Sequence, residues 1–392
     1  MNTRKLIYFT GFMDLLGVSM IIPLLHLHLQ KLNASLVLIG LIDSLYGGLQ
    51  IFSGPLLGNW SDTKGRKPIL LICVIIAAFN YFVLGLTSYL WIAISTRILL
   101  GIFKQSQSLS RAYLADITPD NQKPNVFGKF NAISSLGFIV GPTVGGHLSE
   151  VPYGFEIVCS VSSLLFLINF ILICIYLPTV QPVKENEVEK EAFQAMKLIT
   201  QLNWENYWDI FLVKFFLSLA VLVYRNNFTI TLTKTLGLSL KSIGYVVSFY
   251  SIISSLSGFL IGYIARFYLH HSSLLQHVAI LQMIALTGLT FANTLPSLIA
   301  FLIPFAISNS IARVCVTSLT VQRCRKNEKG KVVGVGQSIT SGSRMIAPVL
   351  AGIAQQVTIF GPGVTGICCS ITGIFFIGIL NRNNQKVSFK SD

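Results

Sequence analysis

Long apolar runs alternate with short polar segments along the whole chain. Twelve of these runs have about 18 to 25 residues, the length that a helix needs to cross roughly 30 Å of hydrocarbon. The pattern therefore predicts an all-α integral membrane protein with twelve transmembrane helices. The expected spans are approximately 6–29, 36–58, 69–88, 90–113, 125–147, 157–177, 208–232, 242–266, 273–292, 295–318, 331–356 and 359–380.

The longest polar segment divides the runs into two sets of six. Its centre is charged and rich in helix-favouring residues, which predicts a surface helix within a linker. We therefore expect a first six-helix half over 1–178, a cytoplasmic linker over 179–207, a second six-helix half over 208–382 and a cytoplasmic tail over 383–392.

Glycine and proline recur between the two halves. With a shift of 204 residues (244 − 40), residues 39, 40, 44, 46, 53, 54 and 58 meet identical residues in the second half. With a shift of 206 (348 − 142), Gly128, Ser135, Pro142 and Gly146 fall on Gly334, Ser341, Pro348 and Gly352. Shared apolarity alone does not make glycine and proline recur, so the halves are predicted to be a parallel repeat.

Composition narrows the class of protein. The 392 residues are 53% hydrophobic and 11% charged, whereas soluble domains are roughly 25% charged. A net charge of +14 would suit nucleic acid, but no basic stripe alternates with aromatic residues, so no nucleic-acid partner is expected. The seven cysteines lack metal-ligand spacing, and His26 and His28 lie on different faces of a helix. We therefore expect neither a metal nor another cofactor.

The positive charges predict an orientation. Seven of the 29 lysines and arginines lie in the interior of the expected spans, and the others lie in loops, in the termini or within about one and a half turns of a span end. If the N-terminus is cytoplasmic, nineteen of the others lie in cytoplasmic segments and three, Lys31, Lys234 and Lys241, lie on the opposite side. The positive-inside rule therefore predicts that both termini are cytoplasmic. Which membrane holds the protein is left open, as is glycosylation at Asn33.

Charges inside a span are candidates for function, because they are costly unless they face water or a partner. The acids are Asp14 and Asp43, and the seven cations are Arg97, Lys104, Arg111, Lys214, Arg225, Arg313 and Arg344. If Lys104, Arg225, Arg313 and Arg344 line a cavity, its ligand is an organic anion rather than a cation. The opposing hypothesis is that these cations cap carbonyl groups or bind lipid headgroups.

Three of these cations are spaced by seven residues. Arg97, Lys104 and Arg111 are predicted to share one helix face with Gly101 and Ser108. A face with three cations does not point at lipid. Arg111 is expected to reach the cytoplasmic surface, as long cationic side chains often do.

The segment from Gly58 to Pro68 is predicted to be a short charged turn between the second and third spans. Its pattern, G-x-x-x-D-x-x-G-R-K-P, resembles the signature loop of the major facilitator superfamily. The resemblance implies that Arg66 pairs with Asp116 and that Asp62 sits under the N-terminus of the eleventh helix. It implies a cytoplasmic gate built from Gly58, Asp62, Gly65, Arg66, Lys67, Arg111 and Asp116. An ordinary cytoplasmic hairpin would also explain the segment.

Three further motifs resemble the drug:proton antiporter branch of that superfamily, which includes tetracycline-resistance carriers. They are the stretch from Gly11 to Pro23 around Asp14, the motif Arg97-x-x-x-Gly101, and the fifth-helix motif with Gly137, Gly141, Pro142, Gly145 and Gly146. The last is linked to exchange in that branch, although close helix packing alone also explains it. The first half is also similar to the family of major facilitator superfamily domain-containing protein 9.

The resemblance implies a monomeric secondary transporter that moves a small organic solute by alternating access. Asp14 is expected to carry protons and Arg97 to modulate it, because dryness favours a protonated carboxyl group and a cation favours an ionised one. The competing hypothesis is a permanent buried pair of Asp14 and Arg97.

Two further hypotheses compete with a proton-coupled transporter. One is a uniporter without proton coupling, and the second is a transport-inactive receptor or scaffold. No enzyme is expected, because the sequence shows no Ser/His/Asp set, no metal motif and no nucleotide-binding loop.

Overall fold

The computed structural model describes residues 3–179, 204–268, 271–324 and 329–388, and this part of the chain is helical without a strand. The chain divides into two compact units. Unit 1 comprises Met1–Gln194 with Leu238–Phe249, and unit 2 comprises Ala195–Gly237 with Tyr250–Asp392. The surface helix expected in the linker lies outside the described residues.

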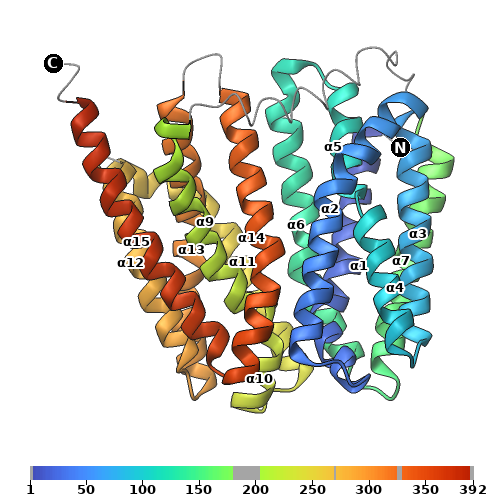
Figure 1. The fold of residues 1–392 in the computed structure, drawn as a ribbon. Coiled ribbons are helices and arrows are strands. Elements are labelled where there is room, and N and C mark those ends of the chain that lie inside the picture. The colour runs from blue at the N-terminus through green and yellow to red at the C-terminus, as the bar shows by residue number, and fades with distance from the viewer. Residues whose placement is uncertain (1–2, 180–203, 269–270, 325–328, 389–392) are drawn as a thin grey trace. The chain divides into compact units, whose positions relative to one another are not determined.

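Unit 1 contains the first six expected spans (Figure 1). The fourth span is broken into two helices, α4 and α5. The helices are α1 (Thr3–Lys31), α2 (Leu36–Lys64), α3 (Arg66–Leu86), α4 (Leu90–Phe103), α5 (Ser106–Asp116), α6 (Lys123–Leu148) and α7 (Gly154–Tyr176), with the short η1 (Asp120–Gln122) before α6.

Unit 2 contains the remaining spans, apart from the start of α11, which belongs to unit 1. Here the first span of the unit is broken, into α9 and α10. The elements are η2 (Trp204–Asn206), α9 (Trp208–Asn226), α10 (Phe228–Leu236), α11 (Leu240–Ile264), η3 (Ala265–Phe267), α12 (His271–Thr290), α13 (Leu295–Arg323), α14 (Lys329–Val357) and α15 (Gly361–Ser388).

Every expected span thus has its helix or broken helix among the described residues, which confirms the predicted fold class. Within the same part of the chain, seven helices are long and apolar enough to cross a membrane by themselves: α1, α2, α3, α7, α12, α13 and α15. The fourth and seventh spans are each divided between two shorter helices.

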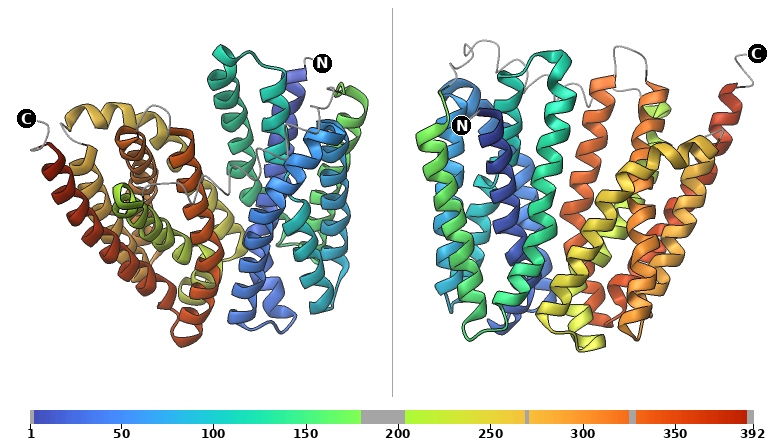
Figure 2. Two further views of the ribbon diagram at one scale, coloured as in Figure 1. Left: turned by 45° about the horizontal axis from the view of Figure 1, so that its top comes forward. Right: turned by 180° about the vertical axis from the view of Figure 1, so that it is seen from behind.

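The predicted repeat is visible in the helix starts and in the packing. Residue 36 plus 204 gives 240, the first residue of α11, and residue 123 plus 206 gives 329, the first residue of α14. In unit 1, α1 packs on α6 and α7, and α3 packs on α4 and α7. In unit 2, the equivalent helices make the same pairs: α9 packs on α14 and α15, and α12 packs on α13 and α15. Figure 2 shows both bundles from two further sides.

The predicted turn from Gly58 to Pro68 is wrong in its extent. Helix α2 continues to Lys64, and α3 begins at Arg66, so that only Gly65 interrupts the helical path. The polar residues continue the helix because Ser61 and Thr63 donate hydrogen bonds back to helix carbonyls. Gly65 has φ +96°, a backbone conformation that glycine adopts without a steric penalty.

The predicted common face of Arg97, Lys104 and Arg111 is also wrong, because the helix does not continue through them. Helix α4 ends at Phe103 and α5 begins at Ser106, with Lys104 at φ −79° and ψ 59°. The segment from Lys104 to Ser108 is polar, and its side chains bond to other helices in place of a helix continuing in register.

The glycine motif of α6 packs against α1. A Cβ atom on Gly137 would lie 2.6 Å from the carbonyl oxygen of Phe12, and one on Gly145 would lie 2.9 Å from the Cα of Met20. Gly141 faces Ser19 of α1 in the same way. At the other end of the motif, a Cβ on Gly146 would lie 2.9 Å from Leu240 O, in the part of α11 that belongs to unit 1.

Pro142 lies between these contacts. Its carbonyl carbon would lie 3.1 Å from a Cβ on Gly244, so the backbone of α6 approaches α11 closely there as well. Close packing therefore accounts for the motif, and its role in exchange stays a prediction.

We expect opposite effects from one substitution at two positions of α6. Gly137→Ala should lower stability by about 1–3 kcal/mol, because the new methyl group overlaps the backbone of α1. Gly128→Ala should be neutral or stabilise by about 0.5–1 kcal/mol, because Gly128 is exposed with nothing near its Cβ position. Thermal unfolding of both purified variants in detergent measures the difference, and equal midpoints would contradict the close approach.

Candidate functional site

The break between α4 and α5 is anchored to α2. The side-chain amide of Gln105 donates to the carbonyl oxygen of Gln50 at 2.9 Å and to Oγ of Ser53 at 3.0 Å. Ser53 in turn donates to Gly101 O at 3.3 Å. Non-helical backbone at membrane depth is tolerated only where protein or a wet cavity satisfies it. The hydrogen bonds with α2 pair some of the polar groups near the break and fix its position.

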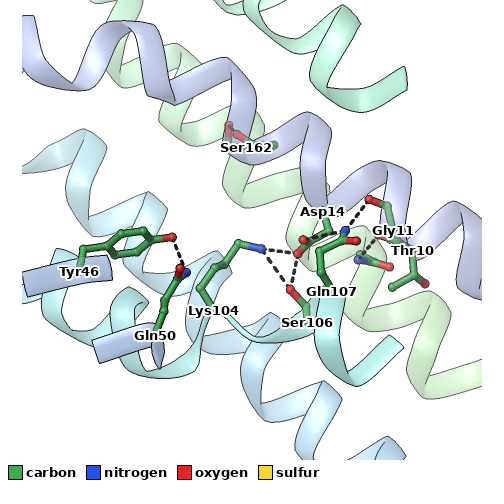
Figure 3. Close-up of polar contacts among 11 residues, drawn as sticks. Thr10, Gly11, Asp14, Tyr46, Gln50, Lys104, Ser106, Gln107 and Ser162 are labelled. Carbon is green, nitrogen blue, oxygen red and sulfur yellow. Dashed lines mark hydrogen bonds and ion pairs between the residues drawn. The ribbon is translucent and has the colours of Figure 1, made fainter. Parts of the chain in front are cut away.

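Asp14 of α1 lies at this break, and its carboxylate is surrounded by donors (Figure 3). Its side chain is 1% exposed, and it forms an ion pair with Lys104. Ser106 donates to the same carboxylate oxygen, and Gln107 Nε2 donates to the other at 3.1 Å. Gln107 also donates to Gly11 O at 2.8 Å, which ties α5 to α1. We call Asp14, Lys104, Ser106 and Gln107 the Asp14 cluster.

A second buried acid forms its own cluster. Asp43 of α2 bonds to His26 Nε2 at 2.6 Å through one oxygen and to Arg97 Nη2 at 3.3 Å through the other. The guanidinium carbon of Arg97 also lies 4.0 Å from the centre of the Tyr46 ring, a cation–π contact. His26, Asp43 and Arg97 form the Asp43 cluster, which joins α1, α2 and α4.

The structure therefore does not bring Asp14 and Arg97 together. Lys104 takes the place beside Asp14 that the sequence assigned to Arg97, and Arg97 pairs with Asp43 instead. The reason is depth along the helices: Arg97 and Lys104 are seven residues apart, which is about 10 Å along an α-helix. The signal that could have found the Asp14 cluster is the polar run from Lys104 to Ser108 inside an apolar span.

The residues of the expected gate are only partly gathered. Arg66 bonds to Asp116 at 2.7 Å, to Ser61 Oγ at 2.7 Å and to Asp62. The implied contact of Arg66 with Asp116 is thus present. Gly58 lies in helical backbone one turn before Asp62, and Gly65 forms the junction.

Two more of the expected gate residues point elsewhere. Lys67 Nζ donates to the carbonyl oxygen of Cys174 on α7 at 2.9 Å. The guanidinium carbon of Arg111 lies 5.9 Å from the centre of the Phe130 ring. We call Ser61, Asp62, Arg66 and Asp116 the gate cluster.

The three arginines expected in a cavity all belong to unit 2. Arg225 lies in the last turn of α9, beside the break, Arg313 lies on α13 and Arg344 lies on α14. All three side chains are exposed, and Arg344 lies close enough to Arg313 and Arg225 for electrostatic repulsion from both. Lys104, which the sequence grouped with them, instead contacts Asp14 in unit 1. Among the described residues, no group of three or more histidines, cysteines and acids could hold a metal ion.

Three comparisons with known proteins point to the same family. A family model described as Major Facilitator Superfamily matches residues 7–348. The quinolone resistance protein NorA of Staphylococcus aureus (strain MSSA476) is 24% identical over 97% of both chains. The class D tetracycline resistance protein of Salmonella ordonez is 31% identical over 48% of this chain and 49% of its own length. The crystal structure of the human organic anion transporter MFSD10 has a TM-score of 0.66 at 18% identity, covering 96% of this chain and 98% of that one.

We expect Asp14 and Lys104 to be coupled in stability. Asp14→Asn should cost about 3 kcal/mol, because it leaves a buried ammonium group without its counter-charge. Adding Lys104→Met should recover most of that loss, whereas adding Arg97→Gln should not, because Arg97 pairs with Asp43. Thermal unfolding of the three variants in detergent tests this, and rescue by Arg97→Gln instead would overturn the observed pairing.

Proposed function

Because this chain belongs to the major facilitator superfamily, we propose that it moves a small organic solute by alternating access and that protons bound at Asp14 drive this movement. The chain is a multi-pass membrane protein, and its relatives are transporters rather than enzymes. The predicted superfamily is thereby confirmed. Two relatives are named for drug resistance, as are carriers of the branch that the sequence resembles.

The observation that supports proton coupling is the Asp14 cluster. A carboxylate with 1% exposure stays charged in a membrane span only while its neighbours stabilise it, and here those neighbours lie on both sides of a helix break. If Lys104 moves away, the carboxylate loses its counter-charge and protonation becomes favourable. A small movement at the break would therefore be enough to bind or release a proton.

The rival is a permanent ion pair that only holds α1 against the break, which would leave the protein a uniporter. Loss of either charge then affects folding but not the energy source of transport. The two possibilities differ in a variant that keeps the fold and lacks both charges, Asp14→Asn with Lys104→Met.

We expect that double variant to exchange solute but not to accumulate it. The probe is chosen by thermal shift, starting with a quinolone and a tetracycline because two relatives are named for resistance to them. In proteoliposomes with a pH gradient, the wild-type protein should concentrate the probe and the double variant should only equilibrate it. A folded double variant that still concentrates the probe along the gradient rules out Asp14 as the proton site. No uptake by the folded wild-type protein would favour a receptor or scaffold.

The gate and the orientation are part of the same proposal. Both termini would face the cytoplasm, so that the gate cluster lies at the cytoplasmic ends of α2 and α5. Its ion pairs join the ends of α2 and α5 to the start of α3, and their loss would favour opening on that side. The carrier would act as a monomer.

Asp62→Asn should therefore increase cytoplasmic access to the Asp14 cluster. The measurement is the rate at which N-ethylmaleimide reacts with a Ser108→Cys probe, after the seven native cysteines have been replaced. Ser108 is exposed on α5, one residue beyond Gln107. Asp120→Asn is the matched control, because its 94% exposed side chain pairs only with Lys123 outside the gate cluster. Equal labelling rates in the two variants would count against the gate.

The solute is expected to carry negative charge. The interior of the spans contains seven cations and two acids, and both acids already have cationic partners in unit 1. The solved structure that is named for an organic anion transporter has the same fold as this chain. A negatively charged solute is therefore compatible with this fold.

A further inference from the structure

Three arginines of unit 2 lie in a part of the unit that lacks acids. Among its described residues the acids are Glu205 in η2 and Asp209 in the first turn of α9, and Asp209 pairs with Arg323. Arg225, Arg313 and Arg344 have no carboxylate within ion-pair distance among the described residues. Like charges that gather without a counter-charge are unfavourable, so a polar or anionic species is needed to stabilise them.

Their depth excludes an ordinary snorkelling role. Arg225 and Arg344 lie 17 (225 − 208) and 15 (344 − 329) residues from the starts of α9 and α14, about 25 and 22 Å along those helices. Arg313 lies 10 residues (323 − 313) from the end of α13, about 15 Å. An arginine side chain near the middle of a bilayer roughly 30 Å thick is far from either headgroup layer. Exposed side chains at this depth therefore face a wet space.

An aromatic platform accompanies the charges. The guanidinium carbon of Arg225 lies 4.7 Å from the centre of the Tyr250 ring, and Asn309 Nδ2 donates to the Tyr250 hydroxyl at 3.0 Å. That hydrogen bond ties α11 to α13 and fixes the ring. The Phe305 ring packs on Tyr250 with centroids 6.2 Å apart. A planar apolar group could therefore stack beside the guanidinium groups.

We propose that Arg225, Arg313, Arg344 and Tyr250 form a binding site for an aromatic carboxylate. The arginines bind the carboxylate, since a guanidinium fork matches its two oxygens. Tyr250 is 7% exposed and carries Arg225 over its ring, so it holds that guanidinium group in position, and the flat face of the guanidinium favours a flat ligand. The site names the solute class of the transporter and in that respect rests on the proposed function, but its occupancy can be measured without transport.

The probe is 1-naphthoate, and 1-naphthamide is its uncharged match. Thermal unfolding of the full-length protein in detergent should show stabilisation that rises with 1-naphthoate concentration and is absent with 1-naphthamide. Arg313→Gln and Arg344→Gln should each weaken the apparent affinity by about tenfold or more, because each removes a charge-assisted hydrogen bond. Tyr250→Leu should weaken the affinity for 1-naphthoate, because it removes the ring that holds Arg225 in position.

A matched control removes the same charge elsewhere in unit 2. Arg266 is exposed in η3, away from the three arginines in the sequence and on another element, so Arg266→Gln should leave the affinity unchanged. Should one glutamine variant fail to fold, Arg344→Lys keeps the charge, removes the fork geometry and is expected to give an intermediate affinity. The proposal is overturned if 1-naphthoate and 1-naphthamide stabilise the protein equally, or if neither compound stabilises it.

A lipid headgroup could offer the same anionic chemistry. Phosphatidylglycerol and phosphatidylcholine are therefore added in parallel as mixed micelles. Stabilisation by phosphatidylglycerol that disappears in Arg344→Gln, with no response to 1-naphthoate, would assign the arginines to lipid and overturn the carboxylate site.

The site and the proposed function can fail separately. Carboxylate binding that depends on these arginines, in a protein that accumulates no solute, would support the site and refute the proposed function. Proton-driven uptake that Arg313→Gln and Arg344→Gln both leave unchanged would support the proposed function and refute the carboxylate site.

Discussion

A charge inside the hydrocarbon of a membrane must have a partner or water, and this constraint organises unit 1. Asp14 and Asp43 are the acids within its spans, and each lies within reach of a cation from the broken span of α4 and α5. Lys104 reaches Asp14 only because the helix breaks there, since a continuous helix would hold Lys104 on the same face as Arg97. The break in turn is held by α2, because Gln50 and Ser53 accept hydrogen bonds from the Gln105 side chain and Ser53 donates to the carbonyl oxygen of Gly101. Charge compensation thus determines the course of one helix and the contacts of two others.

The two units share an arrangement of helices but treat charge differently. In unit 1, the acids within the spans are paired, so its interior is close to neutral. In unit 2, three exposed arginines have no carboxylate partner among the described residues. The broken helix also differs, since it is the fourth span in unit 1 and the first in unit 2. A repeat that keeps its packing while it changes its charges and breaks is compatible with the proposed division, in which unit 1 handles protons and unit 2 binds solute.

The sequence predicted the fold almost completely, because long apolar runs report membrane crossing directly. Starts of α2, α4, α9 and α13 agree with the expected spans to the residue. The errors lie where polar residues had two possible conformations. The charged segment after Gly58 stays helical up to Gly65, because hydroxyl groups and an i,i+4 ion pair satisfy it within the helix. The polar run after Phe103 does not stay helical, because its partners lie on other helices.

The same limitation affected the candidate site. Asp14, Arg97, Lys104 and the three arginines of unit 2 were all found as charges within spans. Which cation meets which acid could not be found, since it depends on a break that no spacing rule marks. The depth of Asp43 relative to His26 and Arg97 likewise follows from helix tilt and packing, which the linear pattern does not contain.

The motif Arg97-x-x-x-Gly101 shows how the two clusters of unit 1 depend on each other. Gly101 lets α4 approach α2 so closely that a Cβ atom there would lie 3.2 Å from Tyr46 O. The same approach brings Arg97 over the Tyr46 ring and onto Asp43, and it brings Gln105 onto Gln50 and Ser53. A larger residue at position 101 would separate α4 from α2 and disturb both the Asp43 pair and the anchor of the break. The arginine and the glycine are therefore one structural unit: the glycine sets the distance, the arginine neutralises Asp43, and the break that follows presents Lys104 to Asp14.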